Sequence, residues 1–191
     1  MHSLQTQSLP VRHRLTVGNF HRMSESGIFN PLADRIELIE GELFEMAPIG
    51  PLHGSKTKKL NHRLSAQAGE MAIVSVQDAV VLDDLSEVYP DIALLRWQAD
   101  FYAQIHPRPA DVLLMIEVAD STVASDRQLK IPLYARHGIV ESWLLDVQNQ
   151  HLEIYRQPDV DGYRQILLPK NDESVSPIQL PELVLEVGAL W

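Results

Sequence analysis

The chain has 191 residues, and its 26 Asp and Glu residues outnumber its 16 Lys and Arg residues, which gives a net charge of −10. It contains no Cys, so disulfides, thiolate catalysis, Cys-based zinc sites and iron–sulfur clusters are excluded. Residues 1–191 are most simply one domain with its own core, and a 45% share of hydrophobic residues excludes collagen-like and wholly disordered chains.

Charge and hydropathy also restrict location and partners. The longest strictly apolar run, Val112 to Ile116, has five residues, whereas a membrane-spanning helix needs about 20. Residues 1–10 lack the charged-then-apolar pattern of a signal peptide, so we expect a cytoplasmic protein with no membrane partner. The acidic balance disfavours coating of nucleic acid through bulk charge, although a local basic face can still hold phosphates.

The first part of the chain predicts an arm followed by a hairpin. Residues 1–31 are polar and end in a turn-rich stretch, and Thr16 is the expected N-cap of a short helix within them. We interpret this segment as a docking arm. Residues 35–46 alternate apolar and acidic side chains around Gly41, which is typical of two half-buried strands joined by a tight turn.

The middle of the chain predicts a helix and three strands. Leu60, Leu64 and Ala68 recur at i, i+4 and i+8 and predict a helix over residues 53–68. Apolar and β-branched runs then predict three strands, at residues 72–82, 89–96 and 111–119.

A second helix and further strands follow. Asp126 is the expected cap of a helix that ends at His137, with Gly138 in the left-handed position after it and Pro132 in its first turn or at a kink. Strands are predicted at residues 141–147, 152–156 and 163–168, with a turn at residues 161–162. The order predicts an α/β (α+β mixed) fold in which helices flank one mixed sheet, with an added N-terminal hairpin and C-terminal β segment.

The C-terminal residues 180–191 are too apolar to remain in water. They either close the core or form part of a dimer interface.

Two carboxylates fall on apolar faces of the central predicted strands. Alternate residues of a strand share a face, so Glu117 projects from the same face as Met115 and Ala119. Asp91 stands at the start of a neighbouring buried strand. A lone buried carboxylate is costly unless a cation or hydrogen-bond donors meet it. Two of them on neighbouring strands indicate a Mg²⁺ site, because Mg²⁺ prefers one or two carboxylates with waters and a phosphate oxygen.

The same residues also fit a structural interpretation, in which Asp91 is a turn residue and Glu117 pairs with an Arg. Lys130 favours the chemical interpretation, since it lies one turn into the following helix, with Asp126 and Tyr134 four residues away on the same face. A lysine directed at the carboxylates can position an attacking water and stabilise a phosphoryl transition state. The alternative is a solvated lysine paired with Asp126.

Several motifs stand in a fixed order between residues 35 and 165: ELIEG at 37–41, MAP at 46–48, His53, YPDIALLR at 89–96, DVLLMIEVADST at 111–122, DRQLKIPLYA at 126–135, Gly138, and WLLD at 143–146. In this combination the chain resembles the Uma family of restriction-endonuclease-like proteins, within the PD-(D/E)XK nuclease superfamily. The Pro-Asp pair followed 26 residues later by Glu117, and then by a Lys and a Tyr on the next helix, is the specific part of the match.

The resemblance implies a core of a helix, three strands, a helix and a strand, together with Mg²⁺-dependent cleavage of phosphodiester bonds. It implies Asp91 and Glu117 as metal ligands and Lys130 as the catalytic lysine. In the superfamily the lysine usually stands two residues after the Glu, where this chain has Ala119, so Lys130 is a displaced equivalent. Residues 140 and 142, a Val and a Ser, also depart from the Pro and the aromatic residue that the family more often has.

Four side chains are accessory candidates with open alternatives. His53 stands at the start of the first helix, where members of the family commonly carry a His. It either contacts a metal-bound water or a phosphate, or has no chemical role. Glu40 either approaches the pocket or is a solvated turn residue, and Tyr134 shares the helix face of the candidate lysine. Glu37 is expected to point outward and is a weaker candidate.

Lys56, Lys59 and Arg63 stand at i, i+3 and i+7 of the first predicted helix and are candidate nucleic-acid contacts. A solvated charged helix face is the alternative. Other sites find no support, since the eight His residues include no i, i+4 pair and the sequence contains no nucleotide-binding or serine-hydrolase motif.

The leading hypothesis is a Mg²⁺-dependent endonuclease that hydrolyses nucleic acid, with DNA as the expected substrate and Mn²⁺ as a substitute cofactor. Asp91 and Glu117 would bind the metal with the carbonyl of Val118 as a third ligand, while Lys130 orients or activates water. The competing hypothesis is a non-catalytic nucleic-acid-binding or oligomeric protein that retains the nuclease fold. This hypothesis is supported by the net charge of −10 and by Ala119, which stands where the superfamily usually has its lysine. A homodimer would suit cleavage of two strands.

Overall fold

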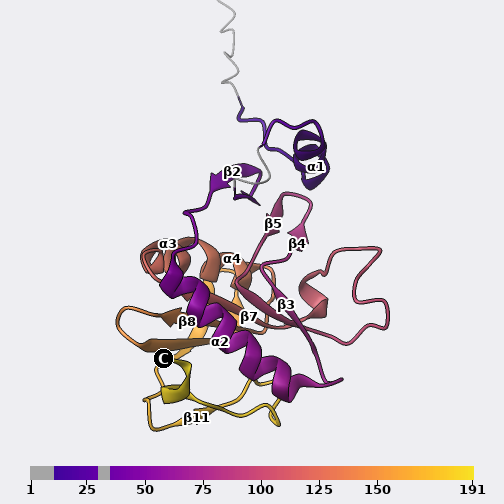
Figure 1. Ribbon diagram of the computed structural model, residues 1–191. Helices are drawn as coiled ribbons and strands as arrows, with labels where there is room; N and C mark the ends of the chain where they lie inside the picture. Colours follow the sequence, from indigo (N-terminus) through magenta and orange to yellow (C-terminus); the bar gives the residue numbers. More distant parts are fainter. Residues whose placement is uncertain (1–10, 30–34) are drawn as a thin grey trace, which may run out of the picture.

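The computed structural model describes residues 11–29 and 35–191 (Figure 1). The remaining residues of the predicted arm, 1–10 and 30–31, lie outside the described residues. The elements in chain order are α1 (Val17–Glu25), β1 (Ile36–Ile39), β2 (Glu42–Glu45), α2 (Pro51–Ala68), β3 (Ile73–Val76), β4 (Val80–Asp83), β5 (Ser86–Val88), β6 (Ile92–Leu95), the 3-10 helix η1 (Pro109–Asp111), β7 (Val112–Ala119), α3 (Val123–Ser125), the π-helical segment η2 (Asp126–Lys130), α4 (Ile131–Arg136), β8 (Glu141–Asp146), β9 (His151–Asp159), β10 (Gly162–Leu167), β11 (Ser174–Val175), β12 (Leu185–Glu186) and the 3-10 helix η3 (Val187–Leu190).

A six-stranded sheet in the order β10-β9-β8-β7-β6-β3 forms the centre of the molecule. Strands β7 and β8 are parallel, and the other neighbouring pairs are antiparallel. All eight residues of β7 are buried. A strand covered on both faces loses the alternation of polar and apolar residues, which explains the nearly continuous apolar run over residues 112–119.

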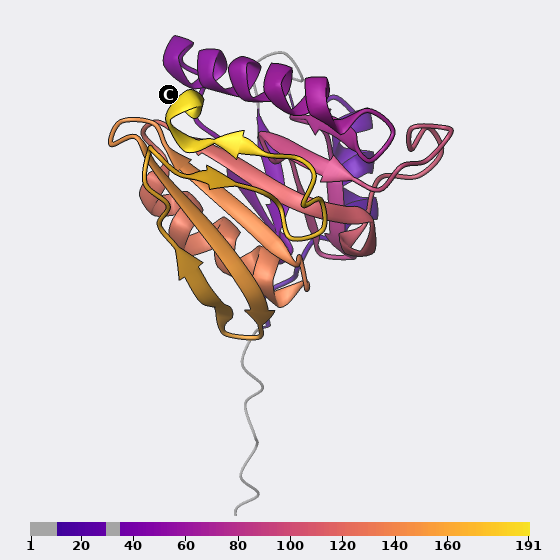
Figure 2. The ribbon, with the colours of Figure 1, turned by 90° about the horizontal axis from the view of Figure 1, so that it is seen from below.

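Helices cover the two faces of this sheet (Figure 2). On one face Leu60 and Leu64 of α2 share a hydrophobic cluster with Ile116 of β7, and on the other Tyr134 of α4 shares a cluster with Leu144 of β8. The order α2, β3, β6, β7, α3 to α4, and β8 confirms the predicted core. No helix within the described residues has the combined length and apolar character that crossing a membrane requires.

A second, four-stranded sheet in the order β2-β1-β5-β4 packs beside the first. Its Ile39 and Val80 are buried in the same cluster as Met115 of β7. Strands β1 and β2 form the predicted hairpin. Gly41 at its turn has φ +80°, and a Cβ there would lie 2.5 Å from the Cβ of Arg14, so the turn requires glycine.

Helix α1 docks on this smaller sheet. Thr16 caps it through reciprocal hydrogen bonds with Asn19, as predicted. The Val17 N–H donates to the carbonyl of Asp84 over 2.8 Å, and His21 Nε2 lies 2.6 Å from Glu87 Oε2. The described part of the arm is therefore docked on its own chain.

The single strand predicted over residues 72–82 is wrong. The structure has two strands there, β3 and β4, which belong to different sheets. Gln77 adopts a left-handed φ of +53° and its N–H bonds to the carbonyl of Asp91, while Asp78 accepts a hydrogen bond from the N–H of Ala79. This turn redirects the chain, so β4 leaves the central mixed sheet and pairs with β5 in the four-stranded sheet.

The second helix also begins elsewhere than predicted. It starts at Val123, after Thr122, so Asp126 is not its cap and lies instead in the π-helical segment η2. The N–H of Ile131 bonds to the carbonyl of Asp126, five residues earlier. Pro132 follows directly, at the start of α4, where the absence of a proline N–H is compatible with this irregular turn. Gly138 has φ +74° just beyond the helix, as expected.

The C-terminal segment closes the core. Leu183, Leu185 and Val187 are buried in the cluster that also contains Leu60 of α2, and β12 pairs with β11. Of the two interpretations of this apolar segment, the structure supports closure of the core by residues of the same chain.

Replacement of Leu183 by Ala is expected to lower the free energy of unfolding by about 2–5 kcal/mol, because a fully buried leucine leaves a cavity. Urea denaturation measures this loss, and the neighbouring Val184→Ala, at a residue 47% exposed, is the matched control with a much smaller effect. Equal losses for the two variants would contradict a core role for the segment.

Candidate functional site

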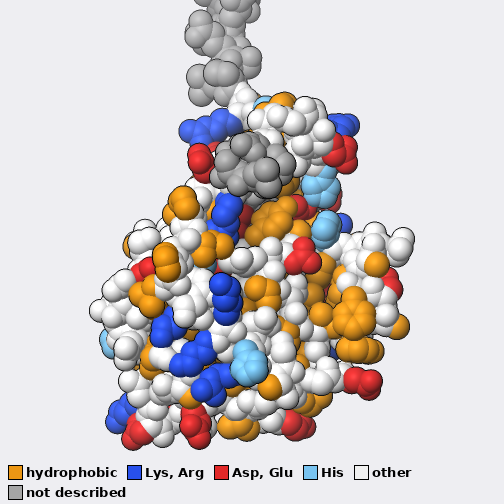
Figure 3. All heavy atoms as spheres, viewed as in Figure 1, with side chains coloured by type: hydrophobic (Ala, Val, Ile, Leu, Met, Phe, Trp, Pro, Cys, Tyr) orange, Lys and Arg blue, Asp and Glu red, His pale blue; other side chains and the backbone are white. Residues whose placement is uncertain are grey.

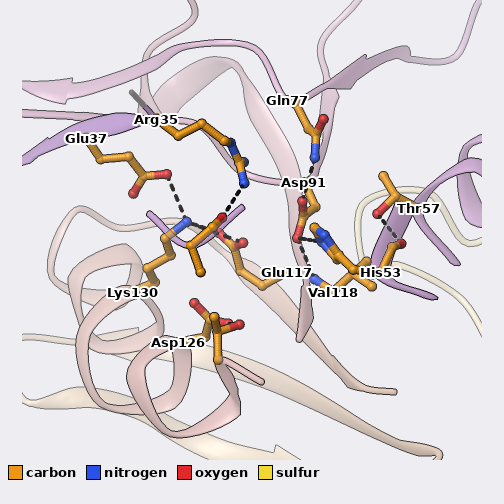
Figure 4. A network of polar contacts seen from close by, with 12 residues as sticks. Arg35, Glu37, His53, Thr57, Gln77, Asp91, Glu117, Val118, Asp126 and Lys130 are labelled. Carbon is orange, nitrogen blue, oxygen red and sulfur yellow. Dashed lines mark hydrogen bonds and ion pairs between the residues drawn. The ribbon is translucent and has the colours of Figure 1, made fainter. Parts of the chain in front are cut away.

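A pocket of about 150 Å³ opens where β7, the N-terminus of α2 and the segment η2 meet. Figure 4 shows Glu117 and the nearby Glu37 turned toward Lys130, and Asp91 turned toward His53. The residues that line it and that bear on chemistry are His53, Asp91, Glu117, Val118, Asp126 and Lys130.

Glu117 lies in β7 beneath the helix formed by η2 and α4. It is 3% exposed. The hydroxyl of Tyr134 donates a hydrogen bond to Glu117 Oε1, and Lys130 Nζ lies 3.4 Å from Oε1 and 3.5 Å from Oε2. Burial raises the pKa of Glu117 well above its usual value, against the opposing attraction of Lys130, and the negative charge of Asp91 raises it further.

Asp91 precedes β6 and is oriented by three neighbours. Its Oδ2 accepts a hydrogen bond from the N–H of Val118 over 2.9 Å, and its Oδ1 accepts one from Gln77 Nε2 over 3.1 Å. Burial acts to raise the pKa of Asp91, but His53 and these two donors outweigh it and lower the pKa below its usual value. Asp91 is therefore held in its anionic form.

His53 lies in the first turn of α2. Its Nε2 is 2.9 Å from Asp91 Oδ2, a close contact without the alignment of a hydrogen bond. The ring thus presents a polar atom at the pocket beside the carboxylate.

Lys130 is 5% exposed and projects from the π-helical segment. Its Nζ donates to Glu37 Oε1 over 2.9 Å and contacts Glu117 at 3.4 Å. Burial acts to lower the pKa of Lys130, but the attraction of Glu117, Glu37 and Asp126 outweighs it and raises the pKa above the usual value. The amine therefore stays protonated, and its chemistry is that of a fixed positive charge and hydrogen-bond donor.

Negative charge is in excess around this lysine. Glu37, Asp91, Glu117 and Asp126 are all buried, whereas Lys130 is the one buried lysine or arginine among the described residues. Burial raises the pKa of Asp126, although Thr122 and the lysine oppose this shift. A surplus of buried carboxylates is costly unless a cation offsets it.

The donors present fit a hard divalent cation. No three His, Asp or Glu side chains of residues 11–29 and 35–191 are arranged to hold one ion together. Mg²⁺ does not require such a cage, because it binds through one or two carboxylates and keeps several waters. Asp91, Glu117 and Val118 line the same pocket and are the residues that could hold such an ion.

Glu37 belongs to the site, although its alternation with apolar neighbours predicted an outward side chain. It is 2% exposed and bonds to Lys130. Three of the four residues of β1 are buried, because this strand lies inside the four-stranded sheet, so alternation does not mark a solvent face. A Glu within a run of Ile and Leu is the signal that could have found it. Gln77, which donates to Asp91, has no comparable feature in the sequence that marks it as a residue of the site.

The other candidates are placed away from the pocket lining. Glu40 accepts from Arg136 Nη2 over 3.0 Å and its side chain is 50% exposed. Lys56 and Arg63 lie partly exposed along α2, and Lys59 Nζ donates to the backbone carbonyl of Trp191.

The fold and the acidic pocket define an α/β protein of the restriction-endonuclease-like class. A family model named Uma2, described as "Putative restriction endonuclease", matches residues 18–188, and the chain belongs to this family. Among solved structures the chain is similar to a crystal structure from Anabaena variabilis ATCC 29413, titled as a putative nuclease belonging to DUF820. The TM-score is 0.72 at 17% identity, over 92% of this chain and 97% of that one, which shows a shared fold. No curated protein matches the chain.

Replacement of Glu117 by Gln is expected to raise the free energy of unfolding of the metal-free protein at pH 8, since it removes a buried carboxylate whose charged form burial disfavours. A carboxyl group whose pKa is raised on folding contributes stability at low pH that is lost as the pH rises through the folded-state pKa. The gain from Glu117→Gln should therefore shrink toward pH 5.

Urea denaturation at pH 5 and pH 8 in the presence of a chelator measures the difference. Glu40→Gln is the matched control, at a partly exposed carboxylate. A gain that is the same at both pH values would contradict the raised pKa of Glu117.

Proposed function

We propose that the protein is a Mg²⁺-dependent endonuclease that hydrolyses phosphodiester bonds in nucleic acid, with DNA as the substrate. The observation that carries the proposal is the meeting of Asp91, Glu117 and Lys130 at one small pocket. Membership of a family described as restriction endonucleases supports it.

Asp91, Glu117 and the carbonyl of Val118 would hold the cation. A bound divalent cation supplies charge stabilisation for the phosphate oxygens during in-line displacement. Mn²⁺ is expected to substitute for Mg²⁺, because it also accepts oxygen ligands in octahedral geometry.

The chain itself supplies orientation and a fixed positive charge. The hydroxyl of Tyr134 orients the carboxylate of Glu117, and the N–H of Val118 orients that of Asp91. Lys130, protonated, would stabilise the charge that develops as a water oxygen bonds to phosphorus and the phosphorus–oxygen bond to the leaving group breaks. His53 stands close enough to Asp91 to contact water or phosphate at the same site.

The basic side chains of α2 are the proposed path for the nucleic-acid backbone. Figure 3 shows Lys and Arg side chains gathered on the face that carries α2. Lys56 lies one turn beyond His53, and Arg63 lies two turns further along the same helix. Lys59 is a weaker candidate, since its ammonium group already bonds to the carbonyl of Trp191.

Homodimer formation stays a prediction.

Purified protein with Mg²⁺ or Mn²⁺ is expected to cleave plasmid DNA, and Asp91→Asn or Glu117→Gln should each lower the rate about 10³-fold or more, because each removes a ligand charge. Gel assays on plasmid, single-stranded DNA and RNA measure this. Glu182→Gln, at an exposed carboxylate, is the control. Nucleic-acid binding without cleavage of any substrate would favour the non-catalytic alternative. Ala119, at the position where the superfamily usually has its lysine, also favours that alternative.

The double variant Lys56→Ala/Arg63→Ala should weaken DNA binding and reduce the slope of log affinity against log salt by about 2, one for each lost phosphate contact. Fluorescence anisotropy with Glu117→Gln protein measures binding without cleavage. Lys58→Ala is the matched control, because two helix positions turn its side chain about 200° from that of Lys56. An unchanged salt slope would contradict the proposed path.

A further inference from the structure

Lys130 is held more closely by Glu37 than by the candidate metal ligand Glu117. Its Nζ lies 2.9 Å from Glu37 Oε1, but 3.4 Å and 3.5 Å from the two oxygens of Glu117. Charge-assisted hydrogen bonds are strong near about 2.7–2.9 Å and weaken as they lengthen. The ammonium group is therefore anchored on Glu37 and makes only a longer contact with Glu117.

Glu37 is well suited to anchor this lysine. It lies in β1 of the four-stranded sheet, and the backbone N–H of Tyr89 donates to the same Oε1 over 3.2 Å, which fixes the carboxylate. Its Oε2 is buried and has no hydrogen-bond partner among the described residues. This second oxygen is a spare acceptor for the ammonium group of Lys130.

We propose that Glu37 is a positioning residue that keeps the ammonium group of Lys130 off Glu117, so that Glu117 remains open to a divalent cation. The inference rests on the metal site of the proposed function. A lysine and a cation compete for the oxygens of the same buried carboxylate. Without Glu37, the nearest negatively charged partner of Lys130 is Glu117, and a direct ion pair between them would oppose cation binding.

Glu37→Gln should therefore weaken the binding of Mn²⁺ about tenfold, the effect of losing one charge-assisted hydrogen bond that holds the lysine in place. Mn²⁺ binding to the full chain is measured by the electron paramagnetic resonance signal of free Mn²⁺ and by calorimetry. Gln keeps the size of Glu and an oxygen that can accept from the N–H of Tyr89. Glu40→Gln, at the turn residue that follows the same strand, is the matched control and should leave the affinity unchanged.

A double-mutant cycle with Lys130→Gln separates this role from two others. If Glu37 acts through the lysine, Glu37→Gln should have no further effect on Mn²⁺ affinity once Lys130 is neutral. A loss that persists in the Lys130→Gln background would make Glu37 a direct ligand and overturn the inference. A loss that follows the melting temperature across the variants would make the role merely structural, and would overturn it as well.

Glu37→Asp provides a second variant if the amide disrupts folding. It keeps the charge but withdraws the carboxylate by one methylene, so it should weaken Mn²⁺ binding by less than tenfold and only while Lys130 is present. Unchanged Mn²⁺ affinity in both variants would overturn the inference.

The results also separate the inference from the proposed function. Wild-type protein that binds no Mn²⁺ would overturn both. Mn²⁺ binding that is equal in the wild type and Glu37→Gln would overturn the inference alone. The expected cycle, together with a failure to cleave any nucleic acid, would support the role of Glu37 and overturn the endonuclease.

Discussion

The burial of several carboxylates around one lysine is the constraint on which the arrangement of this molecule depends. Glu37 comes from the small sheet, Glu117 from the central sheet and Lys130 from the helix above them, so a single ammonium group joins three separate parts of the chain. Its charge offsets only part of the negative charge around it. The described residues around the pocket thus include more buried carboxyl groups than buried lysines or arginines, and a bound cation would offset the difference.

The local backbone is adapted to this cluster at two points. The π-helical turn over Asp126–Lys130 leaves both end residues buried at the pocket, and turns of this kind often occur at functional sites. The left-handed backbone of Gln77 ends β3 and lets its amide reach Asp91. Both irregularities lie beside β6 and β7, whose pairing sets Ile92 opposite Ile116, each one residue from a candidate ligand.

Particular residues explain how much of the fold and site was predictable. Glu117 interrupts a run of apolar residues, and Lys130 follows it at a spacing that returns a helix over the strand, so both could be singled out without coordinates. Glu37 was only a weak candidate, because its neighbours alternate as in a half-exposed strand and only the packing of β1 inside a second sheet buries it. Glu40, three residues further on, bonds to Arg136 instead.

The amino-acid sequence alone predicts the helices, most of the strands, the continuous apolar character of β7 and the residue types that indicate a cation site. These features are encoded locally, in periodicity, capping residues and turns. Three features follow from the three-dimensional packing instead: the division into separate sheets, the closing of the core by the C-terminal segment, and the partner of Lys130. The physical reason is that each depends on contacts between residues far apart in the chain, such as Glu37 and Lys130, whose energies come from mutual burial and leave no periodic trace in the sequence.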